Sequence, residues 1–168
     1  TLADEQQEFF TELADQYGDF VGSRFAIENP ADFKTPVNLA IADAGSERRF
    51  MGMLTDRQNA KHVDAWLKNA AMNFYSLEYA WKKGEHPKRG EFSPDFFIKK
   101  GEQVYVVEIK DEGEINDPST ENVKKHEYAR AHFERLNKWL EKDGQTVRYQ
   151  FNMLAPRDFS AFFQKLRE

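Results

Sequence analysis

The chain has 168 residues, of which 40% are hydrophobic, and it contains no cysteine. This composition excludes general disorder, disulfides, thiolate zinc sites and cysteine nucleophiles, and the length suits one domain with a substantial core. The net charge of −5 argues against a surface covered with basic groups, although it leaves room for a local basic groove.

No stretch of the sequence is apolar and long enough to span a membrane, and no signal peptide is visible. We therefore expect no membrane association and a cytoplasmic location. Because the chain begins with Thr1 and not with methionine, we also expect it to be a piece of a longer protein.

The first part of the chain predicts a helix over residues 2–21. Its apolar side chains recur at helical spacing between acids and glutamines: Phe9, Leu13, Tyr17 and Phe20. The stretch that follows contains two prolines and predicts no clear element. We therefore treat residues 1–45 as an N-terminal helical extension and residues 46–168 as the core.

Two short helices are expected next, over residues 47–55 and 60–69. Ser46 can cap the first of them by accepting a hydrogen bond from its free N–H groups. In the second helix, Val63 and Leu67 would face the core.

Three stretches of different character follow. Aromatic residues over 73–81 predict a strand, and the charged stretch 82–90, with glycine and proline, predicts a loop. Residues 93–110 contain two apolar runs joined by a short polar turn, which predicts a hairpin. The acidic stretch 111–120 predicts a mobile loop.

The most regular helix is expected over residues 121–141, ended by Asp143-Gly144. Residues 147–154 alternate and predict a strand, and residues 159–166 predict a closing helix. The order of helices, three strands, helix, strand and helix predicts an α/β fold, with a central mixed β-sheet of about four or five strands flanked by helices.

The predicted hairpin carries three charges at its open end. Asp95 follows a proline and opens the first strand, and Glu108 and Lys110 close the second. If the turn places Lys99 opposite Val104, the same register places Asp95 opposite Glu108. Because side chains alternate along a strand, Glu108 and Lys110 share one face.

Two carboxylates that face each other across a hairpin repel, so one would take up a proton or destabilise the strand pair. Mg²⁺, with Mn²⁺ as an alternative, binds oxygen ligands and would remove this conflict. Lys110 would then lie beside the ion and hold a water or a phosphate oxygen. The alternative is an edge hairpin whose charges face solvent, but the joint occurrence of Pro-Asp and Glu-x-Lys favours the metal site.

Pro94-Asp95 and Glu108-Ile109-Lys110 resemble the signature of the PD-(D/E)XK nucleases, in which these two motifs lie on adjacent strands. The resemblance implies that Asp95 and Glu108 bind Mg²⁺, with the Ile109 carbonyl as a third ligand. It also implies that Lys110 positions or activates water and steadies the developing charge.

The resemblance extends over roughly residues 46–139. Residues 62–81, followed by the hairpin, are similar to the C-terminal endonuclease domain of type III restriction enzyme subunits and related helicase–nucleases. This implies a restriction-endonuclease-like core that hydrolyses DNA phosphodiester bonds in a restriction or defence system. In this family an acid on the first core helix completes the site, and Glu47 is the matching position.

Glu47 shares a helical stripe with apolar residues, which places it inward although it is charged. The alternative is an ordinary first-turn acid that the helix dipole favours. Both interpretations remain open from the sequence.

Basic residues close to aromatic ones can hold a phosphate backbone. The candidates in and beside the 82–90 stretch are Lys82, Lys83, Lys88 and Arg89. Lys125, on the predicted helix after the hairpin, is a further candidate. For all of them a solvated surface is the alternative. The acidic stretch would repel DNA if it were fixed, so it would fold aside, bind a second ion or gate access.

The sequence has no Walker-type phosphate loop, so the chain alone is not an ATP-driven motor. We expect DNA as a partner, a helicase or ATPase module in the same or a partner chain, and a homo-oligomer as an option. Two other functions stay open: a catalytically silent nuclease-fold module that binds nucleic acid or protein, and a nuclease that acts on RNA.

Overall fold

The fold is described from a computed structural model, which covers most of the chain. The described residues are 24–27, 34–37, 39–42, 45–69, 75–83 and 86–168. The helix predicted over residues 2–21 lies outside them. The part of the extension that is described contains a two-stranded antiparallel sheet, β1 (Arg24–Ala26) with β2 (Leu39–Ile41). Ile27 and Ala40 pack into the main core, so this sheet is joined to the rest of the molecule.

The central sheet has four strands in the order β3-β6-β7-β8. They are β3 (Ala65–Lys68), β6 (Phe96–Lys100), β7 (Gln103–Ile109) and β8 (Arg148–Leu154). The first three pair in antiparallel fashion and β7 pairs with β8 in parallel, so the sheet is mixed. The predicted α/β fold with a mixed sheet flanked by helices is confirmed.

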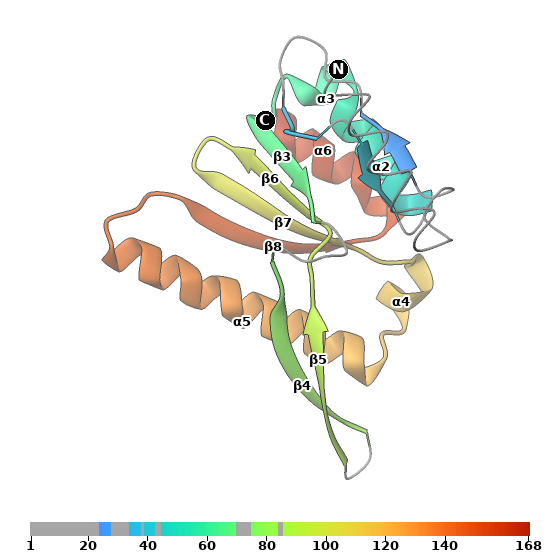
Figure 1. Ribbon diagram of the computed structural model, residues 1–168, viewed down its shortest axis with the longest axis vertical. Coiled ribbons are helices and arrows are strands. Elements are labelled where there is room, and N and C mark those ends of the chain that lie inside the picture. Colours follow the sequence, from blue (N-terminus) through green and yellow to red (C-terminus); the bar gives the residue numbers. More distant parts are fainter. Residues whose placement is uncertain (1–23, 28–33, 38, 43–44, 70–74, 84–85) are drawn as a thin grey trace.

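One face of the sheet packs against α2 (Gly45–Thr55) and α6 (Phe159–Arg167), as Figure 1 shows. Phe50 of α2 lies at the centre of this layer, with its ring centroid 5.0 Å from that of Phe96 and 5.1 Å from that of Phe163. Burial of these rings removes a large apolar area from water, which anchors both helices to the sheet.

The other face carries α5 (Thr120–Lys142). The Phe133 ring stacks with those of Tyr149 and Phe151 on β8, with centroids 6.0 and 6.2 Å apart. The predicted helix over residues 121–141 is confirmed, and so is its end, because Gly144 adopts a φ of 74° that favours glycine. The predicted strand and closing helix that follow are confirmed too, with a 3₁₀ turn, η2 (Pro156–Asp158), between them.

The prediction of a helix over residues 60–69 is wrong. The chain forms the short helix α3 (Arg57–Ala60) and then enters β3. In β3 the buried Trp66 follows the exposed Ala65, which is the alternation of a strand, and the Trp66 N–H donates to the Lys34 carbonyl. The run is too short for periodicity alone to separate a strand from a helix.

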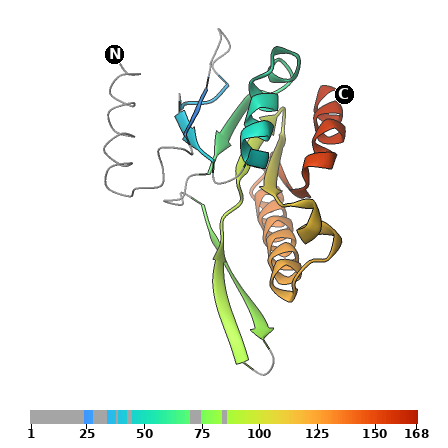
Figure 2. The same ribbon diagram turned by 90° about the vertical axis from the view of Figure 1, so that its right-hand side faces the viewer.

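The prediction of a loop over residues 82–90 is also wrong. β4 (Leu77–Lys83) and β5 (His86–Phe92) form an antiparallel hairpin that extends away from the rest of the molecule (Figure 2). Pro87 is tolerated because both strands of a two-stranded sheet are edges. Gly90 packs closely against Tyr79, since a Cβ at residue 90 would lie 3.0 Å from the ring, which would have to shift.

The stretch expected to be a mobile acidic loop contains the helix α4 (Glu112–Asn116). Its Glu114 accepts a hydrogen bond from the Asn122 side chain at 3.1 Å, which links α4 to the first turn of α5. Ser119 caps α5 by accepting from the Asn122 N–H. Within the part of the chain that the structure describes, no helix is sufficiently long and apolar to cross a bilayer.

Candidate active site

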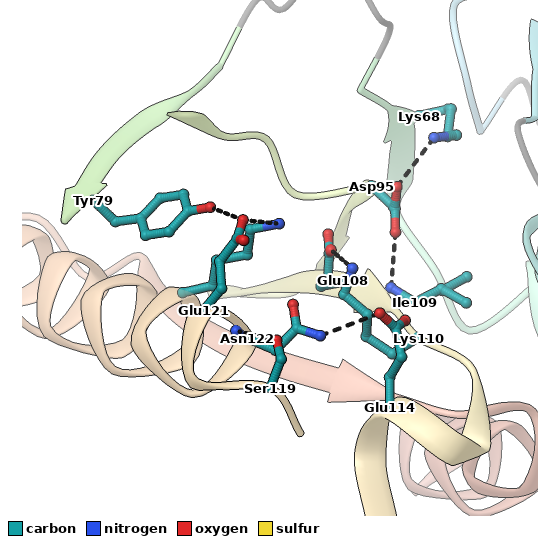
Figure 3. Close-up of polar contacts among 11 residues, drawn as sticks. Lys68, Tyr79, Asp95, Glu108, Ile109, Lys110, Glu114, Ser119, Glu121 and Asn122 are labelled. Carbon is teal, nitrogen blue, oxygen red and sulfur yellow. Dashed lines mark hydrogen bonds and ion pairs between the residues drawn. The ribbon is translucent and has the colours of Figure 1, made fainter. Parts of the chain in front are cut away.

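The site is built on the open end of the β6–β7 hairpin. The predicted pairing of Lys99 with Val104 is confirmed, and the ladder keeps this register to the open end of the hairpin. The next position beyond the ladder brings Asp95 alongside Glu108 (Figure 3). The sequence pattern therefore predicted correctly which two acids the hairpin brings together.

Asp95 is held from two sides. Its Oδ2 accepts a hydrogen bond from the Ile109 N–H at 2.7 Å, and its Oδ1 lies 3.4 Å from the Lys68 Nζ. Its own carbonyl accepts from the N–H of Asn69 at 2.7 Å. The carboxylate is thus fixed between β3 and β7, at the end of both strands.

Glu108 is buried and only half satisfied. Its Oε1 lies 3.0 Å from the Lys110 Nζ, whereas its Oε2 is buried without a hydrogen-bond partner. Burial, followed by repulsion from Asp95, raises the pKa of Glu108 to about 8, although Lys110 opposes the shift. The surroundings of Glu108 thus favour its protonated form, as expected for a buried carboxyl group beside a second acid.

Lys110 continues the parallel pairing of β7 with β8, because its N–H donates to the Leu154 carbonyl at 2.9 Å. Burial alone would lower the pKa of Lys110. The surrounding carboxylates, led by Glu108 and followed by Glu114 and Asp95, outweigh this effect and raise that pKa above its ordinary value. Lys110 is therefore a cation at neutral pH.

Glu47 enters the same region from α2. Its side chain is buried, as the stripe on this helix predicted, and its Oε2 lies 3.1 Å from the Lys68 Nζ. Lys68 thereby connects Glu47 with Asp95. The inward placement of Glu47 is confirmed, and Glu47 also lies in the first turn of α2, where the helix dipole favours an acid.

The sequence analysis does not identify Lys68 as a site residue, because it predicts a helix over residues 60–69. Its side chain is only 9% exposed. The signal that could have found it is the run Ala65-Trp66-Leu67-Lys68, in which the alternation of a strand places Lys68 on the same face as the buried Trp66.

Lys125 lies at the start of α5, near the same carboxylates. Its Nζ is 3.7 Å from the Glu121 Oε1 and 5.6 Å from the centre of the Tyr79 ring, and its charge lowers the pKa of Glu108 slightly. Lys124 is more exposed and pairs with Glu127. The structure therefore places Lys125, and not its neighbour, beside the site.

The other predicted nucleic-acid contacts lie on the β4–β5 hairpin and not in the site. Lys88 and Arg89 are exposed on β5, where neighbouring residues point to opposite faces, so they do not form one patch. Lys82 and Lys83 belong to β4, but their side chains lie outside the described part of the structure.

The residues at the open end of the hairpin fit a divalent cation. The unpaired Glu108 Oε2 is a buried acceptor beside a second carboxylate, and Mg²⁺ characteristically binds one or two carboxylates together with water or phosphate. Asp95 and Glu108 would hold the ion, with the Ile109 carbonyl as the main-chain ligand. Within the described ranges no group of three or more His, Cys, Asp or Glu residues is arranged for metal binding, so this set would leave most ligand positions to water and substrate.

No family model matches this chain, and neither do any of the curated proteins or solved structures.

Proposed function

We propose that this protein is a Mg²⁺-dependent endodeoxyribonuclease that hydrolyses phosphodiester bonds. The observation that carries the proposal is the buried, unpaired Oε2 of Glu108, held beside Asp95. An arrangement of this kind destabilises the metal-free protein, since it buries a titratable group without satisfying it. A bound dication provides the missing partner, so the proposal explains why the chain keeps two acids together.

Lys110 has a distinct role in this reaction. Its raised pKa keeps it protonated, so it donates hydrogen bonds to the attacking water or to a phosphate oxygen and does not remove the proton from water. Water attacks phosphorus and releases a proton to solvent, the bond to the leaving oxygen breaks, and that oxygen takes up a proton from solvent. The bound Mg²⁺ supplies Lewis-acid stabilisation of the charge that develops on the phosphate.

The surroundings of the site restrict how DNA approaches it. Glu112 and Glu114 on α4 are exposed close to Lys110, so they repel a phosphate backbone on that side. Lys125 at the start of α5 offers a positive charge on another side. A backbone that enters along α5 therefore meets less repulsion than one that enters over α4.

The test is cleavage of plasmid and linear DNA, with Mg²⁺ and with a chelator. We expect the cleavage rate to fall at least about a hundredfold in each of three variants, Asp95→Ala, Glu108→Ala and Lys110→Ala, because each deletes a group that stabilises the transition state. Lys99→Ala is the matched control, since it removes an exposed lysine at the other end of the same hairpin. Full cleavage by the three folded site variants would end the proposal.

A catalytically silent module that binds nucleic acid or protein is the second candidate. The exposed acids of α4 and the net charge of −5 favour a silent module over a nuclease, and a protein partner over nucleic acid, because both weaken DNA binding at the site. Calorimetry with Mg²⁺ or Mn²⁺ on the wild type and Asp95→Asn separates the two. Ion binding that Asp95→Asn removes supports the nuclease, and no binding to either protein supports the silent module.

We further propose DNA as the substrate and a restriction or defence role. A helicase or ATPase module, in the same or a partner chain, would deliver DNA to the site. The oligomeric state remains a separate prediction. Parallel digestion of DNA and RNA tests the substrate, and faster cleavage of RNA would overturn this part.

A further inference from the structure

Beside the proposed Mg²⁺ position, the site contains a cation of its own, the Lys68 ammonium group. Its Nζ lies 3.1 Å from the Glu47 Oε2 and 3.4 Å from the Asp95 Oδ1, so it bridges two carboxylates from different elements (Figure 3 shows its contact with Asp95). The side chains of all three residues are at most 17% exposed. This is an enclosed ionic triad and not a surface ion pair.

The strand pairing holds Lys68 in place. Lys68 is opposite Phe96 in the β3–β6 ladder, and its Nζ lies 5.2 Å from the centre of the Phe96 ring. The following residue, Asn69, donates its N–H to the Asp95 carbonyl. The position of the ammonium group is therefore fixed by the backbone as well as by the two carboxylates.

The charge of Lys68 is maintained in this buried setting. Burial disfavours the charged form, but two carboxylate oxygens lie within 3.4 Å of the ammonium group and compensate its charge. The triad thus keeps one positive charge between two negative ones at neutral pH. On the other side of Asp95, the Lys110 Nζ lies 3.0 Å from the Glu108 Oε1.

We infer that Lys68 is a built-in counter-ion that takes the position a second divalent cation would otherwise occupy between Glu47 and Asp95, so that the site binds a single metal ion. The inference deepens the proposed function, and it rests on that proposal only for the ion that Asp95 and Glu108 would bind. In this role Lys68 is a positioning residue, since it holds Glu47 and Asp95 and leaves the Glu108 side of Asp95 for the metal.

The geometry explains why the ammonium group and a second ion exclude each other. Both carboxylates direct an oxygen at the Lys68 Nζ, from 3.1 and 3.4 Å. A hard cation would bind the same oxygens at roughly 2.0–2.6 Å, so it would need the space and the charge balance that the ammonium group now uses. Without Lys68, the Glu47 and Asp95 carboxylates would lose the cation that they share, and the Glu108 oxygen without a hydrogen-bond partner would lie near Asp95.

The experiment counts bound ions. Mn²⁺ is titrated into the wild type, Lys68→Ala, Lys68→Gln and Lys99→Ala, and free Mn²⁺ is measured by electron paramagnetic resonance. We expect about one ion per chain in the wild type and in Lys99→Ala, whose lysine is exposed and far along the hairpin. We expect about two ions in Lys68→Ala, and the second is lost when Glu47→Gln is added. Lys68→Gln, which keeps a side chain of similar length, serves if Lys68→Ala does not fold.

The outcomes separate this inference from the proposed function. A folded Lys68 variant that binds one ion with wild-type affinity overturns the inference and leaves the nuclease proposal intact. A wild type that binds no ion counts against the nuclease proposal, whereas a gain of one Glu47-dependent ion in Lys68→Ala would still support the inference. Absence of ions from every variant overturns both.

Discussion

Replacement of Glu108 by glutamine should stabilise the metal-free protein. The carboxyl group has an ordinary pKa of 4.5, and in the folded chain that pKa is raised to about 8, chiefly by burial. Between these values the folded protein binds more protons than the unfolded chain. Its free energy of unfolding therefore falls as the pH rises through this window, by up to about 1.4 kcal/mol per pH unit.

The size of the effect follows from the width of the window. From pH 5 to pH 8, the wild type should lose about 3 kcal/mol of stability relative to Glu108→Gln, because the neutral amide does not titrate. At pH 7 the free energy of unfolding of the variant should exceed that of the wild type by up to about 3 kcal/mol. The gain is reduced by the stabilisation that is lost when Lys110 no longer pairs with the Glu108 carboxylate. This residue would thus stabilise the transition state of the reaction while it destabilises the fold.

Urea unfolding in the presence of a chelator, at intervals of half a pH unit, measures the difference. Urea is preferred because guanidinium chloride screens charges. Glu102→Gln is the matched control, since it makes the same change of carboxylate to amide at an exposed position in the turn of the same hairpin. If the curves for Glu108→Gln and the wild type run parallel, the buried carboxyl does not titrate as described and the reasoning is refuted.

Two further predictions concern the metal and the packing of α5. Mn²⁺ should raise the thermal unfolding temperature of the protein. Its apparent affinity should increase about tenfold per pH unit between pH 6 and pH 8, because Glu108 must lose a proton before it can bind the ion. Calorimetry that shows a pH-independent affinity would contradict this. Asn137→Ala should lower the free energy of unfolding by about 1–3 kcal/mol, since the Asn137 side chain both donates to the Tyr149 carbonyl and accepts from the Tyr149 N–H. A loss below about 0.5 kcal/mol in urea unfolding would show that water replaces these hydrogen bonds.

The central hairpin could be predicted from the sequence because its signals are local. Two apolar runs around Gly101 determine the turn, the register follows from the turn, and the register determines that Asp95 meets Glu108. The burial of Glu47 was predictable for a similar reason, since a helical stripe depends only on the spacing within one helix.

The parts that could not be predicted depend on contacts between distant segments. β3 is only four residues long, and its strand character comes from pairing with β6 and from a hydrogen bond to the Lys34 carbonyl. Because β3 was assigned to a helix, Lys68 was not linked to the site. The β4–β5 hairpin was missed in the same way, since Gly90 and Pro87 usually indicate a loop and only the packing of Tyr79 explains the glycine.

The parallel pairing of β7 with β8 has a consequence for how the molecule assembles. β6 and β7 are joined by a tight turn and can pair within microseconds. β8 can pair with β7 only after the connection through α4 and α5 has formed, which is slower. We therefore expect the hairpin to bring the two acids together early, while water still surrounds them, and the acids to lose that water only when β8 completes the sheet. Changes at Glu108 should then act on the unfolding rate far more than on the folding rate.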